Sequence, residues 1–158
     1  MTQNKRQSAF KSIVSIHLII SVLATLIVGI SYTIRKNGEL SSDKDFMLLE
    51  LLVPIIAIGS FLVSHYVSKN KLKSIDKHTK LVDKLAVFKQ IKVIQWVSLL
   101  GSVMLASVGF LISGQQNLLL YAMMIGVMIL YFRPIKSRVV EDLNLSPEES
   151  DDLMSYTD

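Results

Sequence analysis

The stretch VIQWVSLLGSVMLASVGFLISGQQNLLLYAMMIGVMILYF, from Val93 to Phe132, contains no charged residue. A helix crosses the hydrocarbon core of a bilayer with about 20 apolar residues, so this run is too long for one crossing. The polar cluster SGQQN at 113–117 interrupts it with residues typical of turns. The run therefore predicts two membrane helices, 93–112 and 118–132, joined by a tight turn.

Two earlier apolar segments predict two further crossings. Residues 12–34 carry no formal charge, and residues 46–67 carry only Glu50. These segments are apolar on every side, whereas the strands of a membrane barrel alternate lipid-facing and lumen-facing residues. The sequence thus predicts an all-α membrane protein built as an antiparallel four-helix transmembrane bundle.

The composition also favours a membrane protein over a soluble domain. Of the 158 residues, 51% are hydrophobic and 19% are charged, and the mean hydropathy is +0.45. The charges are confined to short blocks between long uncharged stretches. Cysteine is absent, which excludes disulfides, thiolate metal sites and cysteine nucleophiles. The apolar segment 12–34 exceeds the length of a signal-peptide core, so we expect it to be a retained anchor.

Lysine and arginine gather on one side of the predicted membrane. They mark the N-terminus 1–11, the loop and helix extension 68–92, and the start of the tail 133–158. The other two loops are mixed in sign or uncharged. By the positive-inside rule, both termini are expected in the cytoplasm of a bacterium, with the chain in its inner membrane. The orientation of the chain in the membrane therefore accounts for its formal net charge of +4, and no nucleic-acid partner is expected.

Small residues recur at intervals of four in three of the predicted spans. Residues four apart share a helix face, so each series predicts a shallow groove for close helix packing. The preferred interpretation is packing within the chain, and the alternative is a second subunit in a homo-oligomer or membrane complex. The series are Ser21, Thr25 and Gly29; Ser98, Ser102 and Ala106, with Gly101 beside them; and Ala122 and Gly126.

Glu50 is the one carboxylate inside a predicted span. It lies four residues, or roughly 6 Å, inside the start of its helix, which places it near the outer interface. Pro54 removes the backbone donor that would bond the carbonyl of Glu50, which predicts a kink. Two interpretations follow: a structural role near the helix end, which we prefer, or an ion or proton site formed by Glu50 and Pro54.

The loop between the second and third spans places apolar residues among lysines at helical spacing. This pattern is typical of an amphipathic helix on an anionic inner leaflet, or of an extension of the neighbouring helices into solvent. Lipid is therefore an expected partner. The residues expected to contact headgroups are Lys69, Lys71, Lys73, Lys77, Lys80, Lys84 and Arg133.

The tail contains the sequence SPEE at 146–149, a capping box with proline at the first helical position. It predicts a short acidic C-terminal helix that extends to about Tyr156. This helix is expected either to fold against the lysine-rich loop on the same side of the membrane or to dock a basic partner.

Three segments resemble the small four-transmembrane-helix proteins of unknown function found in Bacteroidota: LVPIIAIGSFLVS, LAVFKQIKVIQW and YFRPIKSRVVEDLNLSPEE. The resemblance covers residues 53–149 and is most specific in the tail. It implies a fold and an origin, and it carries no catalytic or binding residue.

The expected function is that of a non-enzymatic accessory or scaffold subunit. His17 and His65 have no metal-binding or triad spacing, so no catalytic residue, metal or cofactor is expected. Two alternatives remain: a small oligomeric channel or transporter that uses Glu50, and a membrane enzyme that acts on lipid or quinone beside the two histidines.

Overall fold

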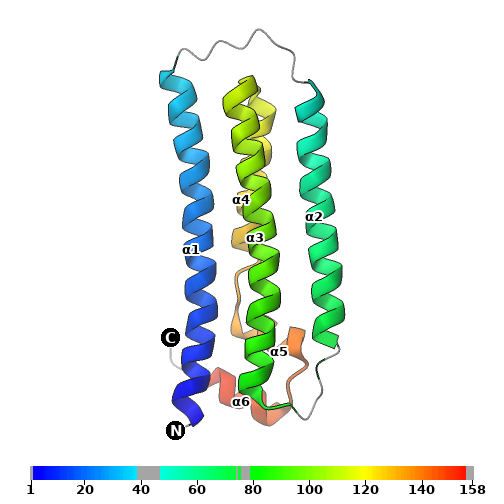
Figure 1. Ribbon diagram of the computed structural model, residues 1–158. Helices are drawn as coiled ribbons and strands as arrows, with labels where there is room; N and C mark the ends of the chain where they lie inside the picture. Colours follow the sequence, from blue (N-terminus) through cyan, green and yellow to red (C-terminus); the bar gives the residue numbers. More distant parts are fainter. Residues whose placement is uncertain (1, 39–46, 74, 76–78, 156–158) are drawn as a thin grey trace.

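The computed structural model of the chain describes residues 2–38, 47–73, 75 and 79–155 (Figure 1). Within these ranges the chain is helical and has no strand, which confirms the prediction of an all-α protein. The helices are α1 (Thr2–Asn37), α2 (Met47–Lys73), α3 (Leu81–Ser113), α4 (Gln116–Tyr131), α5 (Lys136–Leu143) and α6 (Pro147–Met154).

Three of the described helices, α1, α2 and α3, are long and apolar enough to cross a membrane. Helix α4 has only 16 residues and meets the same test only together with α5, from which it is bent by 80°. The break follows from Pro134, which removes a backbone donor directly after α4. The described part of the chain therefore has three or four candidate membrane spans.

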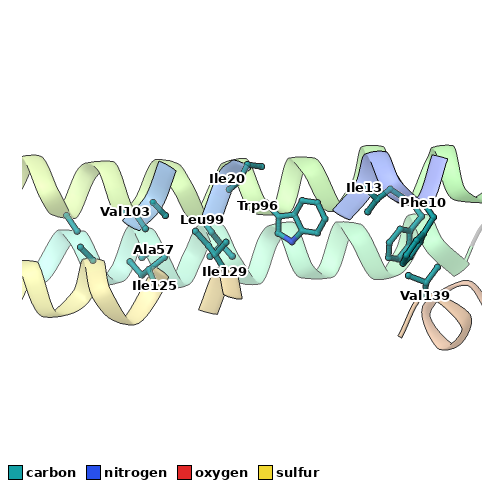
Figure 2. Close-up of a cluster of buried hydrophobic side chains, with 14 of the residues drawn as sticks. Phe10, Ile13, Ile20, Ala57, Trp96, Leu99, Val103, Ile125, Ile129 and Val139 are labelled. Atoms are coloured by element: carbon teal, nitrogen blue, oxygen red, sulfur yellow. The ribbon is translucent and has the colours of Figure 1, made fainter. Parts of the chain in front are cut away.

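Helix α3 is the centre of the molecule. It packs against α1, α2 and α4, and α1 and α2 lie on opposite sides of it (Figure 1). The buried side chains form a continuous column along α3, with Phe10 and Val139 at one end, Trp96 in the middle and Val103 toward the other end (Figure 2). Such close packing holds helices together even in lipid, where burial from water no longer drives association.

The outward faces of the long helices are apolar. Leu18 and Leu26 on α1, Leu62 on α2, and Met124 and Val127 on α4 are all exposed in the isolated chain. A water-soluble monomer rarely leaves so much apolar surface uncovered. These faces support a position within lipid.

At one end of the molecule, α5 lies beside the end of α2, and α6 lies by the beginnings of α1 and α3 (Figure 1); we call this end the base. Helix α3 begins at Leu81 and continues into the apolar stretch without a break. Its first turns bury Leu85 and Phe88 in the same core as Phe10 and Leu153. Of the two interpretations of the lysine-rich loop, the structure thus shows a helix extension, which is packed rather than fully solvated.

At the opposite end, Gly114 makes the tight turn between α3 and α4, where the sequence predicts one. Its φ of +72° is left-handed, and its N–H donates to the carbonyl of Phe110 at 2.8 Å. The guanidinium of Arg35 lies against Gly114, where a Cβ would sit, and donates to the carbonyl of Leu111 at 3.3 Å. The left-handed backbone therefore favours glycine, and a Cβ at this position would also displace the Arg35 guanidinium.

The predicted C-terminal helix is present as α6. The Ser146 hydroxyl accepts from the backbone N–H of Glu149 at 3.3 Å, and the Glu149 carboxylate accepts from the backbone N–H of Ser146 at 3.1 Å. These two bonds complete the predicted capping box. Helix α5 was not predicted; it ends at Leu143, and the next residue, Asn144, adopts a left-handed φ of 47°.

Candidate functional site

Two ion pairs attach the tail helices to α3 at the base. The Lys84 ammonium bonds both carboxylate oxygens of Glu149 on α6 at 2.9 Å. The Lys92 ammonium bonds the carboxylate of Asp142 on α5 at 2.8 Å and also lies over the ring of Phe88. Of the two interpretations of the acidic tail, the structure shows the one in which it folds against the lysine-rich segment.

The environment of Glu149 favours its charged form. Burial by itself raises the pKa of this carboxyl, but hydrogen bonds from Lys84 and Ser146 and the charge of Lys84 outweigh it and hold the pKa below its ordinary value. Glu149 is therefore ionised at neutral pH.

Lys84 departs from the expectation that it contacts lipid headgroups. Its side chain is only 4% exposed because the α3 extension turns it toward α6, where Glu149 neutralises it. The other expected headgroup residues that the structure describes, Lys69, Lys71, Lys80 and Arg133, are exposed. The Lys73 side chain and the whole of Lys77 lie outside the described part of the chain.

A cavity of about 590 Å³ lies at the base between α2, α3 and α5. We call it the base cavity. Its wall is charged on both sides, with lysines and a histidine on α2 and α3 and carboxylates on α5. The lining residues are His65, Lys69, Leu72, Ile75, Lys84, Lys92, Glu141, Asp142, Leu143 and Asn144.

The sequence interpretation missed most of this cavity. Lys92 pairs with Asp142 and Lys84 with Glu149, so two of its lysines are neutralised. The available signal was the acidic pair at 141 and 142, which follows the last span on the same predicted side as the lysine-rich loop. What the sequence did not show is that the 80° bend after α4 turns these acids toward α3.

Glu50 lies at the opposite end of the molecule and bonds to the start of α4. The side-chain amide of Asn117 donates to its carboxylate at 3.0 Å. Helix α2 continues through Pro54 without interruption. Glu50 thus links α2 to α4.

The small residues divide into buried and outward-facing sets. Those at buried positions are Ser21, Ser102, Ala106 and Ala122; Ser98 and Gly126 are half-buried, and Thr25, Gly29 and Gly101 are exposed. A Cβ added at Gly29, Gly101 or Gly126 would touch nothing within 4 Å. These three glycines therefore do not serve close helix contacts within the described chain.

The close approach of α3 and α4 occurs instead at Gly109, which was not predicted. A Cβ at Gly109 would lie 3.2 Å from a methyl carbon of Leu118. The signal was weak because Gly109 stands outside the series of small residues spaced by four.

The two histidines serve different parts of the structure. His17 is buried, bonds the carbonyl of Ile129 at 2.8 Å, and meets the ring of Trp96 edge-on with centroids 4.8 Å apart. His65 is exposed, stacks on Phe61 and lines the base cavity. In the described ranges, no group of three or more histidines and carboxylates is placed to hold a metal ion.

Two more cavities border the long helices. A groove of about 460 Å³ between α2 and α3 is lined mostly by apolar atoms and by the hydroxyls of Ser60, Ser64 and Ser68. A cavity of about 650 Å³ between α1 and α4 includes Arg35 and Asn117. Among the three, the base cavity has the densest set of charged side chains.

Comparison of the chain with protein-family models, with curated proteins and with solved structures finds no match in any of them. The resemblance to small Bacteroidota membrane proteins gains no support from these comparisons.

Proposed function

We propose that the chain is an integral protein of the bacterial inner membrane. In this proposal α1 to α4 form an antiparallel four-helix transmembrane bundle, and both termini and the base face the cytoplasm. The candidate spans and their exposed apolar faces support membrane insertion. The lysines that gather at the base support its cytoplasmic position, by the positive-inside rule.

We further propose that it acts as a non-enzymatic accessory or scaffold subunit. The observation that carries this proposal is the ion-paired attachment of α5 and α6 to α3, because it makes the tail part of the folded base. Glu148 and Asp151 on α6 remain exposed while Glu149 faces inward. This arrangement presents a fixed acidic surface that suits a basic segment of a partner.

Copurification in mild detergent tests the proposal. The full-length tagged chain is expected to retain a stoichiometric protein partner, and Glu148→Lys with Asp151→Lys is expected to release it. The control is Asp83→Lys, which reverses an exposed acid on α3 and should leave the partner bound. A ring of identical subunits with no other protein would contradict the accessory role and favour a pore.

The channel alternative makes a separate prediction. In liposomes, a channel that selects cations at Glu50 would lose a pH-dependent current on Glu50→Gln. Because the carboxylate is already bonded to Asn117, we expect no such current in either protein. A current that Glu50→Gln abolishes would replace the scaffold proposal with the channel.

A further inference from the structure

The length of α3 fixes the level of the base cavity relative to a bilayer. Its 33 residues span about 50 Å, whereas the hydrocarbon core is about 30 Å thick. Counting some 20 residues back from Ser113 places the inner boundary of the core near Val93. Lys92, which lines the base cavity, then lies where the lipid headgroups begin.

Two of the three lysines that line this cavity are neutralised by ion pairs. Lys92 is paired with Asp142, and Lys84 with Glu149. Lys69 on α2 and Glu141 on α5 also line the cavity and have no ion-pair partner among the residues that the structure describes. One positive and one negative group therefore remain available to a ligand.

We propose that the base cavity binds the headgroup of a zwitterionic phospholipid, one with a phosphate and a primary ammonium. The phosphate pairs with Lys69, with His65 one turn away on the same face of α2, and the ammonium donates to Glu141. This inference rests on the proposed membrane placement of the chain.

The lining favours a ligand that carries both charges over a singly charged one. A purely anionic headgroup meets Lys69 but is repelled by Glu141, and a simple cation meets the reverse conflict. A zwitterion satisfies both charges without leaving either one unpaired in a partly enclosed site. Primary ammonium groups also donate three hydrogen bonds, which a quaternary ammonium lacks.

The size and shape of the cavity suit such a group. Its volume of about 590 Å³ falls within the range usual for small-molecule sites. Leu72 and Ile75 lie beyond Lys69, on the side away from the hydrocarbon core, so the glycerol and first acyl carbons leave the cavity in the opposite direction, past His65. The remaining chains would lie along the exposed apolar faces of the long helices.

Native mass spectrometry of the full-length chain tests this proposal. After delipidation in detergent, the protein is titrated with phosphatidylethanolamine, phosphatidylglycerol or phosphatidylcholine. We expect preferential retention of phosphatidylethanolamine, and a loss of affinity of about tenfold or more in Lys69→Ala and in Glu141→Gln, since each removes a charge-assisted bond. The controls Lys11→Ala and Asp83→Asn remove exposed charges that do not line the cavity and should bind like the parent.

Competition between soluble phosphoethanolamine and the lipid identifies the source of the headgroup. If soluble phosphoethanolamine displaces the lipid and binds with the same dependence on Lys69 and Glu141, the site recognises the free zwitterion as well. If it does not, the lipid is the ligand. Both results support the site. Equal retention of the three lipids, or equal affinity in Lys69→Ala and the controls, would overturn it.

Alkaline extraction of membranes separates this inference from the proposed function. A chain released into the soluble fraction would contradict the membrane placement itself. A chain that stays in the membrane pellet but shows no lipid preference would contradict only the base-cavity proposal.

Discussion

The imidazole Nε2 of His17 on α1 lies 2.8 Å from the backbone carbonyl oxygen of Ile129, close to the end of α4. A carbonyl only accepts hydrogen bonds, so this nitrogen carries the proton and donates it. The usual helical donor to Ile129 would be the N–H of Arg133, which bonds instead to the carbonyl of Leu130 at 3.2 Å. His17 therefore caps α4 from a neighbouring helix.

Replacement of His17 by alanine should destabilise the protein by about 1–3 kcal/mol, because it leaves the Ile129 carbonyl without its cap and opens space beside Trp96. The free energy of unfolding in mixed detergent micelles measures the change. His65→Ala removes an exposed imidazole and should change stability by less than about 0.5 kcal/mol. Equal stability of the two variants would rule out the capping role.

The Lys84–Glu149 pair predicts that the attachment of α6 depends on pH. The folded pKa of Glu149 lies below its ordinary value, so the pair contributes fully above the ordinary pKa and is lost as the pH falls through the lowered one. The protection factors of the α6 amides, which correct for slower intrinsic exchange in acid, should therefore fall as the pH drops below the ordinary carboxyl pKa, before those of the long helices.

Glu149→Gln isolates the charge, because glutamine still completes a capping box. It should release α6 at neutral pH at a cost of roughly 3 kcal/mol, since it leaves the buried Lys84 ammonium without its counter-charge. The matched control is Glu148→Gln, at the exposed residue next to Glu149, in which the α6 amides should stay protected from exchange. Unchanged acid sensitivity in Glu149→Gln would show that another group controls the release.

Two glycines of α3, Gly109 and Gly101, should respond differently to replacement by valine. Gly109→Val should destabilise the chain by about 1–3 kcal/mol, because its side chain would push into the buried Leu118 side chain and force it out of its packed position. Gly101→Val faces open space and should cost less than Gly109→Val by at least about 1 kcal/mol. Thermal unfolding in detergent compares the two, and similar midpoints would refute the close approach at Gly109.

The absence of cysteine permits a clean test of orientation with single introduced thiols. A maleimide that does not cross membranes should label Asn37→Cys in intact spheroplasts and Lys11→Cys only after lysis. Both positions are exposed, so burial does not account for a difference between them. Labelling of Lys11→Cys in intact spheroplasts would invert the topology and place Glu50 on the cytoplasmic side.

The sequence predicts the parts of this fold that a bilayer dictates. Uncharged runs and the SGQQN cluster identify the helices and the turn at Gly114, since lipid excludes charge and unpaired backbone from the core. The capping box identifies α6 for an equally local reason, because both hydrogen bonds of the box join Ser146 and Glu149.

The candidate site was harder to predict because it depends on pairs distant in the chain. Lys84 and Glu149 are 65 residues apart, and no local pattern states that one neutralises the other. The same holds for His17 and Ile129, which are 112 residues apart. Spacing by four places Ser21, Thr25 and Gly29 near one helix face, but it does not indicate whether that face meets another helix or lipid.

The shortness of α4 has a consequence for the lipid around the protein. Sixteen residues span about 24 Å, several ångströms less than the hydrocarbon thickness of an average bilayer. An α4 that crosses alone leaves hydrophobic mismatch on one flank of the molecule, while α1 and α2 match or exceed the bilayer on the others. The bilayer must then thin beside α4, and this asymmetric deformation would draw the protein toward thinner membrane regions.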